Sequence, residues 1–294
     1  MFWKKSKIAS KQSPNQNHSE SVVPPQNSEG INKPGHFHFV PWVIFLAAIL
    51  FFIGTAIKTS PYRLFRPYSV LTARHLISTQ SKLSDDKSRW LVLIPAAQSG
   101  SESNFWIDQI PITIAAYMKC VTEEKCTPPH YRGYFEKYTD NILYRNYPIT
   151  YVSWQEAKNY CEIHQGTLPT ESQWMIAAGI TFGFRYPWGD EEPNFALANY
   201  DGFYQGLTPA GWLPQGASPY GVLDMAGNVR EWTLDPYSSD DNTGGDTDRI
   251  LKGGSSSDYP QTLEITAFQW HSEKSAGFNR GFRCVYTADS FGTK

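Results

Sequence analysis

Cysteine is scarce in this sequence, and the few cysteines are widely spaced: Cys120, Cys126, Cys161 and Cys284. No two of them form a C-x₂-C pair, which argues against a structural zinc site. An even number fits disulfides in an oxidising compartment, whereas reduced thiols buried in a core are the alternative. The spacing alone leaves every possible pairing open.

Charge is sparse as well. Only 18% of the residues are charged and the formal net charge is −2, so we expect no nucleic-acid partner. Apolar residues make up 40% of the chain, with 10 Trp, 17 Tyr and 17 Phe. This composition predicts a mostly globular chain in which a large aromatic core lies under many loops.

Several functional motifs are missing. The sequence contains neither a G-x-S-x-G nor a P-loop motif, and no internal repeat of solenoid length. The acidic segment Asp235–Asp248 lacks the glutamate that an EF-hand has at its twelfth position. We therefore interpret this segment as a solvated loop near a partner surface.

The N-terminal region holds one long hydrophobic run. Residues 1–38 are polar and predict a disordered tail. Residues 39–57 contain no charged side chain and as a helix would span about 28 Å, which predicts a single transmembrane helix. A buried core helix is the alternative, but such a helix is seldom apolar on every side for five turns. A cleaved signal peptide would begin earlier and have a shorter apolar region.

Basic residues flank this run on both sides, so the positive-inside rule leaves its orientation open. The possible disulfides favour a C-terminal region outside the cytosol. Residues 58–88 predict a juxtamembrane stem with a short helix over 71–79. The domain itself is expected over 89–288, followed by a tail at 289–294.

Local signals place the first elements of this domain. The run Trp90–Ile94 predicts a strand that Pro95 ends. Thr113 predicts the N-cap of a helix over Ile114–Val121, which carries Cys120.

Two capping boxes predict two further helices. Ser153 begins a helix that would run to Gln165 and stop at Gly166, and on it Cys161 points into the core. Thr170 begins another, which ends near residue 179. Turn residues dominate from 180 to 294, where we expect little regular structure.

The segment Tyr220–Trp232 contains two carboxylates around a turn of small residues. Asp224 and Glu231 flank Gly227, at which the backbone can bend sharply. Backbone carbonyls between two carboxylates would form an all-oxygen site that suits calcium. Taken alone, this spacing favours a tight turn with two solvated acids.

The order of these segments resembles one known family, the formylglycine-generating-enzyme or sulfatase-modifying-factor family, over about residues 90–285. In chain order, the matching residues are Leu93-Ile94-Pro95; Pro111-Ile112-Thr113 with Ala116-Tyr117 and Cys120-Val121; Val152-Ser153-Trp154 with Ala157 and Tyr160-Cys161; Thr167-Leu168-Pro169-Thr170-Glu171 with Trp174 and Ala177-Ala178; Tyr186-Pro187-Trp188-Gly189; Tyr220–Val229 with Glu231-Trp232; Lys252-Gly253-Gly254-Ser255; and Gly281-Phe282-Arg283-Cys284.

The resemblance implies an α+β, loop-rich fold of the C-type-lectin-like class, with two helices packed on small twisted sheets. It also implies two disulfides. One joins Cys161 to Cys284 and so bridges the first long helix to the C-terminal strand. The other, Cys120–Cys126, closes a short local loop.

The chemistry of the family is not matched. Its enzyme oxidises a substrate cysteine with two cysteines of its own, which hold copper shortly after the Gly-Gly-Ser turn. Counted from Gly253, those two positions are Asp258 and Leu263, and neither has a thiol. A tryptophan of the enzyme is replaced by Arg230. We therefore expect no copper and no oxidation of a sulfatase cysteine.

A second branch of the family holds non-haem iron with a His-x₃-His-x-Glu cluster. Here His130, His164 and His271 lie far apart in the sequence, and no such cluster exists. We interpret each as an ordinary surface or core histidine.

We predict that the ligand groove of the fold is reused for a protein or glycan partner, with a lining of Arg230, Ser255, Asp258, Phe268 and Trp270. By analogy with bacterial members of the family, the protein would be a membrane-anchored, periplasmic scaffolding or regulatory module of the cell envelope. The alternative is an enzyme with altered chemistry in the same groove, which would use Asp258, Ser255 or Arg230.

The resemblance also implies structural calcium, which would cross-link loops and stabilise the fold. Its ligands would form two sets: the Asp224 and Glu231 carboxylates with the Gly227 and Val229 carbonyls, and the Asn199 and Asp201 side chains with the Tyr200 and Phe203 carbonyls.

Overall fold

The computed structural model describes residues 80–84, 89–99, 101, 103–130, 138–139, 141–238 and 247–291. The predicted tail, the predicted transmembrane helix at 39–57 and most of the predicted stem lie outside these residues. Among the helices of the described part, none combines the length and the apolar character that crossing a bilayer requires.

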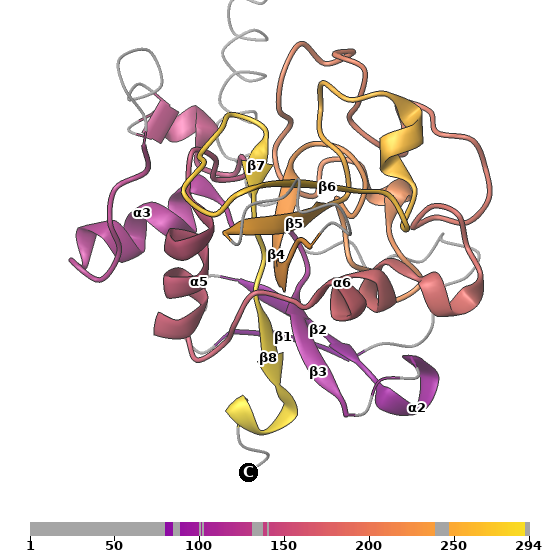
Figure 1. Cartoon of the computed structure of the whole chain (residues 1–294), viewed down its shortest axis with the longest axis horizontal. Coiled ribbons are helices and arrows are strands. Elements are labelled where there is room, and N and C mark those ends of the chain that lie inside the picture. The colour runs from indigo at the N-terminus through magenta and orange to yellow at the C-terminus, as the bar shows by residue number, and fades with distance from the viewer. Residues whose placement is uncertain are drawn as a thin grey trace, which may run out of the picture. The chain divides into compact units, whose positions relative to one another are not determined.

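The described chain mixes short helices with short strands (Figure 1). In chain order the elements are β1 Ser81–Leu83, β2 Trp90–Ile94, α2 Ala96–Ser99, β3 Phe105–Asp108, α3 Ile114–Thr122, η3 Ile142–Tyr144, α5 Trp154–Ile163, α6 Glu171–Ala178, η4 Ile180–Phe182, η5 Pro214–Gly216, β4 Arg230–Pro236, β5 Asp248–Lys252, η6 Pro260–Leu263, β6 Phe268–Ser272, β7 Arg280–Gly281, β8 Val285–Thr287 and η7 Ala288–Phe291. The η elements are 3₁₀-helices.

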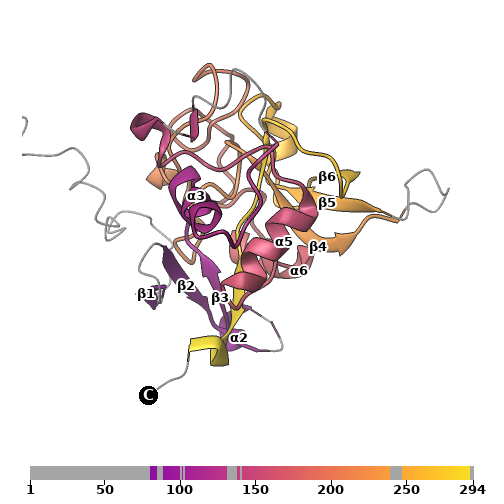
Figure 2. The ribbon, with the colours of Figure 1, turned by 90° about the vertical axis from the view of Figure 1, so that its left-hand side faces the viewer.

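The strands form two four-stranded sheets, which are separate groups in both views (Figure 1 and Figure 2). The first has the order β1-β2-β3-β8 and is antiparallel throughout. Strand β1 pairs Ser81 with Val92, so part of the region predicted as a stem belongs to this sheet. The sequence does not predict this strand, because three residues are too few for a periodic pattern and the strand depends on hydrogen bonds to β2.

The second sheet has the order β6-β5-β4-β7. Its first three strands are antiparallel, whereas β4 and β7 are parallel, with Arg230 opposite Arg280. This sheet and β8 contradict the expectation of little regular structure after residue 180. Short strands separated by Gly- and Pro-rich turns leave too little periodicity to be detected in the sequence.

The three capped helices form where the sequence predicts them. Thr113 accepts a hydrogen bond from the Ala116 N–H and begins α3, and complete capping boxes begin α5 and α6. Helix α6 ends at Gly179 in a left-handed conformation. Helix α5 ends at Ile163, before the predicted end, because Gln165 already has a left-handed φ of 63°.

Helices α5 and α6 cover opposite faces of the second sheet. Trp232 and Leu251, which are register partners, pack in one core cluster with α5 residues such as Trp154. On the other face, Glu231 receives a hydrogen bond from Trp174 of α6 at 2.8 Å. Side chains alternate between the two faces of a strand, so neighbouring residues of β4 contact different helices.

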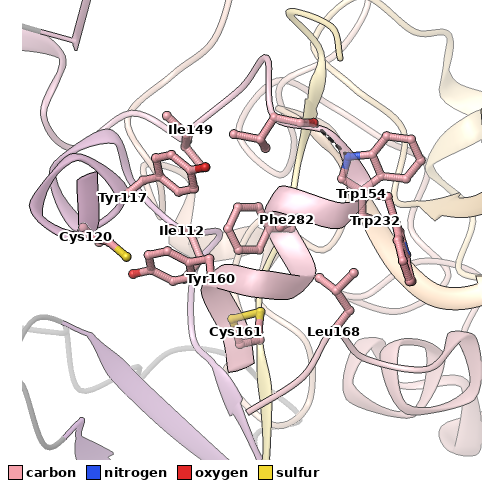
Figure 3. Packing of buried hydrophobic residues seen from close by; sticks show 14 of the residues in the cluster. Ile112, Tyr117, Cys120, Ile149, Trp154, Tyr160, Cys161, Leu168, Trp232 and Phe282 are labelled. Atoms are coloured by element: carbon pink, nitrogen blue, oxygen red, sulfur yellow. Dashed lines mark hydrogen bonds between the residues drawn. A yellow bond between two sulfur atoms is a disulfide. The ribbon is translucent and has the colours of Figure 1, made fainter. Parts of the chain in front are cut away.

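Two disulfides are present, and they are the pairs that the family resemblance implies. Cys120 is joined to Cys126 after α3, and Cys161 of α5 is joined to Cys284 beside β8. The second bridge lies in the α5 core, next to the rings of Tyr160 and Phe282 (Figure 3). It therefore ties the helix to the C-terminal part of the chain.

Candidate functional site

The turn between Asp224 and Glu231 has a strained backbone. Asp224, Gly227 and Asn228 have φ angles of 54°, 79° and 63°. A Cβ added at Gly227 would lie 2.2 Å from the carbonyl oxygen of Asn199, so only glycine fits this approach. Asn199 and Gly227 also form an isolated β-bridge. The turn thus brings the two predicted calcium sets side by side.

Glu231 is engaged in the core. Its side chain is buried, and its two oxygens accept hydrogen bonds from the Arg283 guanidinium at 2.7 Å each. The Trp174 indole N–H adds a third at 2.8 Å. A calcium ion at Glu231 would have to replace the guanidinium, so this member of the first predicted set does not fit its environment.

Asp224, the other carboxylate of that set, lies in a hydrogen-bonded turn. Its Oδ2 accepts from the Gly211 N–H at 2.8 Å and from the Asn228 amide at 3.4 Å. Burial raises the pKa of the Asp224 carboxyl to about 6, while the Gly211 hydrogen bond acts in the opposite direction.

Asn199, from the second predicted set, is better suited to a cation. It is 1% exposed, and its Oδ1 is buried without a hydrogen-bond partner, while its amide nitrogen donates to the Gly206 carbonyl. A buried oxygen without a hydrogen-bond donor is expected where a cation would bind it. Asp201 is exposed, whereas the Tyr200 carbonyl already accepts a hydrogen bond from the Phe203 N–H.

Three of the five predicted groove residues meet in one cluster. Arg230 at the start of β4 forms an ion pair with Asp258, and the two side chains are 9% and 12% exposed. The Ser255 hydroxyl donates to the other oxygen of Asp258 at 3.0 Å. Burial lowers the pKa of the Arg230 guanidinium and Asp258 raises it. The cluster is therefore a nearly buried ion pair to which the Ser255 hydroxyl is hydrogen-bonded.

Phe268 and Trp270 do not line this cluster. Lys252 is the register partner of both Glu231 and Phe268, so Phe268 shares the face of Glu231, which is opposite to that of Arg230. Trp270 follows on the same face as Phe268. Both are exposed, and the Tyr237 ring stacks on Trp270 with centroids 4.9 Å apart. One groove lined by all five residues is therefore a wrong prediction, because it crosses the sheet.

Leu263, at the second replaced cysteine position, is fully buried in a small cluster with Tyr186, Ala198, Tyr200 and Ala226. It packs the loops together and offers no polar group to the Arg230–Asp258 ion pair. The two positions that follow the Gly-Gly-Ser turn thus have different roles: Asp258 is electrostatic and Leu263 is apolar.

A comparison with known protein families gives a match to the sulfatase-modifying factor enzyme 1-like domain over residues 74–288. The chain belongs to the sulfatase-modifying-factor family. The matched residues include both sheets, α5, α6 and the Arg230–Asp258 cluster.

Curated relatives in this family include active and inactive members. The inactive C-alpha-formylglycine-generating enzyme 2 of Bos taurus is 34% identical over 156 residues, which cover 47% of this chain and 50% of that protein. The formylglycine-generating enzyme of Streptomyces coelicolor is 31% identical over 176 residues, covering 49% and 54%. The chain thus spans about half the length of these relatives.

Solved structures support the same fold. PvdO from Pseudomonas aeruginosa superposes with a TM-score of 0.56 at 16% identity, covering 71% of this chain and 98% of that one. At this identity the likeness concerns the fold alone.

The thiols of this family member are all in disulfides. The sequence has four cysteines, and both disulfides use them. No thiolate is left to hold Cu(I) or to react with a substrate cysteine. Among the described residues, no group of three or more His, Cys, Asp and Glu side chains is arranged to hold a metal ion.

Sequence reasoning missed three features of the domain. Arg280 and His271 share the Arg230 face of the second sheet, as a result of strand pairing between distant segments. A cavity of about 330 Å³ lies elsewhere, with a largely aromatic and apolar lining that includes Tyr144, Tyr147 and Phe278. Its tyrosines lie in a segment where the sequence shows no regular element.

Proposed function

We propose that this domain is a binding module that has lost the oxidase chemistry of the sulfatase-modifying-factor family. The observation that carries the proposal is the Arg230–Asp258 ion pair at a position where the enzyme has a copper-binding cysteine. A guanidinium–carboxylate pair neutralises itself and offers no soft ligand to Cu(I). The absence of any unbridged cysteine in the sequence supports the same conclusion.

The test is conversion of a Cys-x-Pro-x-Arg peptide to the aldehyde by the purified full-length protein supplied with Cu(I). We expect no aldehyde by mass spectrometry above the level of a matched Asp258→Asn variant. Aldehyde formation that the variant lacks would overturn the proposal. It would favour the alternative, an enzyme that uses Asp258, Ser255 or Arg230 in altered chemistry.

The partner would be a protein or a glycan rather than a nucleic acid. Exposed Trp270 and Phe268, with Tyr237 stacked beside them, are the residue types that anchor such partners. The aromatic cavity is large enough for a small ligand or a side chain. Substituting Trp270 by Ala leaves the core intact, so loss of partner binding with an unchanged melting temperature would assign the patch.

We also propose that residues 39–57 anchor the domain in a membrane and that it functions outside the cytosol as part of a bacterial cell envelope, in the periplasm. The charge-free run of nineteen residues and the two disulfides support this. Protease applied to spheroplasts should digest the C-terminal domain. Protection of that domain until the inner membrane is lysed would contradict the orientation.

Structural calcium remains part of the proposal for the set around Asn199. The buried, unpartnered Oδ1 of Asn199 supports it. The set around Glu231 lacks comparable support, since Arg283 neutralises that carboxylate.

A further inference from the structure

Two arginines on the Arg230 face of the second sheet have a buried hydrogen-bond donor that is unused. The Nε atoms of Arg230 and Arg280 are buried, and neither has a hydrogen-bond partner. Arg230 as a whole is only 7% exposed. A buried N–H of a charged group that lacks an acceptor costs free energy, so two of them in one place indicate a missing acceptor.

Strand pairing puts these arginines next to each other. Arg230 and Arg280 are register partners in the parallel β4–β7 pair, so their side chains leave the sheet on one face. His271 leaves β6 on that face as well, because it alternates with Trp270. Burial lowers the pKa of the His271 imidazole, and the charges of Arg280 and Arg230 lower it further, against Asp248, which raises it.

The contacts of the two arginines leave positive charge in excess. Arg230 is paired with Asp258, whereas Arg280 donates to the neutral Ser275 hydroxyl at 2.6 Å. Burial and the charge of Arg230 both lower the pKa of the Arg280 guanidinium. Among the described contacts of the pair, one carboxylate thus faces two guanidinium groups.

The Arg280 guanidinium packs closely against a glycine. A Cβ added at Gly277 would lie 3.1 Å from its Cζ and 3.2 and 3.3 Å from its two terminal nitrogens. Arg280 and His271 are both only partly buried, so the cluster reaches solvent on their side. A small group can therefore approach Arg280 without unfolding the sheet.

We propose that Arg230 and Arg280, with His271 beside them, form a receptor for an oxyanion group carried by the ligand of this domain. The inference rests on the proposed binding function and adds the chemical class of the ligand. A guanidinium presents its N–H donors in a planar fork that matches the oxygens of phosphate, sulfate and carboxylate. An oxyanion there would supply the acceptor that the two Nε donors lack and offset the excess charge.

The test is an NMR titration of the purified full-length protein in detergent, followed through the His271 ring resonance, with inorganic phosphate, sulfate, acetate and chloride at matched ionic strength. We expect saturable binding of at least one oxyanion, accompanied by a rise in the pKa of His271, because the bound anion offsets the charge of the arginines. The preferred anion distinguishes a phosphate or sulfate ester from a carboxylate. A response to chloride equal to that of all three oxyanions would overturn the proposal.

Two variants assign the binding to the arginines. Arg280→Gln should weaken binding of the preferred oxyanion by about tenfold or more, because the variant loses charge-assisted hydrogen bonds. Gly277→Ala should weaken it while keeping both charges. Arg185→Gln is the matched control, since Arg185 is exposed and paired with Glu192 and Glu264. Unchanged affinity in Arg280→Gln and Gly277→Ala, with folding verified by circular dichroism, would contradict the assignment.

The outcomes separate this inference from the proposed function. A protein that binds no oxyanion but makes no aldehyde retains its proposed role as a binding module with a ligand of another class. A protein that makes aldehyde loses that role, whichever anion it binds.

Discussion

Glu231 and Arg283 form a two-pronged ion pair at the centre of the domain, with side chains 1% and 0% exposed. The pair links β4 to the segment before β8, and Arg283 also donates to the Leu223 carbonyl at 2.8 Å. Burying the two charges costs desolvation energy. Replacing one of the two residues therefore leaves the other charge buried and uncompensated.

We therefore expect Glu231→Gln to lower the free energy of unfolding by about 3 kcal/mol or more. Urea unfolding followed by tryptophan fluorescence measures the change. The double variant Glu231→Gln/Arg283→Met should lose less unfolding free energy than the two single variants lose together, because neither charge then remains buried alone. Strict additivity would show that the pair is not coupled.

The long disulfide should contribute more than the short one. The Cys161–Cys284 bridge joins residues 123 apart in sequence and the Cys120–Cys126 bridge residues 6 apart. By loop closure, the Cys161→Ala/Cys284→Ala variant should lose about 4–5 kcal/mol and the Cys120→Ala/Cys126→Ala variant about 2 kcal/mol. Equal losses in chemical unfolding would refute this order.

Gly227 should tolerate substitution less well than Gly221, which precedes the Asp224–Glu231 turn. Gly227→Ala meets both a positive φ and the Asn199 carbonyl oxygen at 2.2 Å. Gly221→Ala is the matched control, because Gly221 has a similar φ of 82° and open space around a Cβ. We expect about 1 kcal/mol of destabilisation for Gly221→Ala and clearly more for Gly227→Ala. The same loss for both would show that the Asn199 contact is unimportant.

Calcium should stabilise the domain through Asn199 and Asp201. At a free calcium concentration of one hundred times the dissociation constant, the gain would be about 2.7 kcal/mol, and EDTA should remove it. Asp201→Asn keeps the shape and the left-handed backbone but removes a charge, so it should abolish most of the calcium effect on the melting temperature. A melting temperature that is indifferent to EDTA in the native protein contradicts the proposal.

His271 should make the domain less stable at acidic pH. Its pKa in the folded protein lies below the usual value of about 6.5, so the unfolded chain binds the proton more readily. The contribution of His271 to the free energy of unfolding should therefore fall as the pH drops below about 6.5, with a slope of at most about 1.4 kcal/mol per pH unit. It is measured as the difference between the native protein and His271→Gln, because Asp224, with a raised pKa of about 6, acts in the opposite direction in both proteins. Arg280→Gln should make this slope shallower, and His271→Gln should remove it. A slope unchanged in both variants would contradict the assignment.

Local chemistry made the helices predictable. A hydroxyl at Ser153 or Thr170 satisfies backbone N–H groups within three residues, and Gly179 accepts the left-handed conformation that ends α6. These effects need no knowledge of the rest of the chain. The disulfides and the class of fold followed from the collinear family motifs.

Strand pairing made the site unpredictable. The same residues, Arg230 and Phe268, lie on one face or on opposite faces depending on the register of β4, β5 and β6, and a shift of one residue exchanges the faces. That register rests on two pairings, of Glu231 with Lys252 and of Lys252 with Phe268, which join segments separated in the sequence. For the same reason, nothing in the sequence indicates that Arg280 lies beside Arg230.

The Cys161–Cys284 bridge has a consequence for the fate of the protein after damage. All four strands of the second sheet, the candidate calcium residues and Arg230, Asp258 and Arg280 lie between its two cysteines, within one covalent ring. A single proteolytic cut anywhere in that ring opens the chain but leaves the two fragments joined. A nicked molecule would therefore keep its full mass on a non-reducing gel and divide only after reduction.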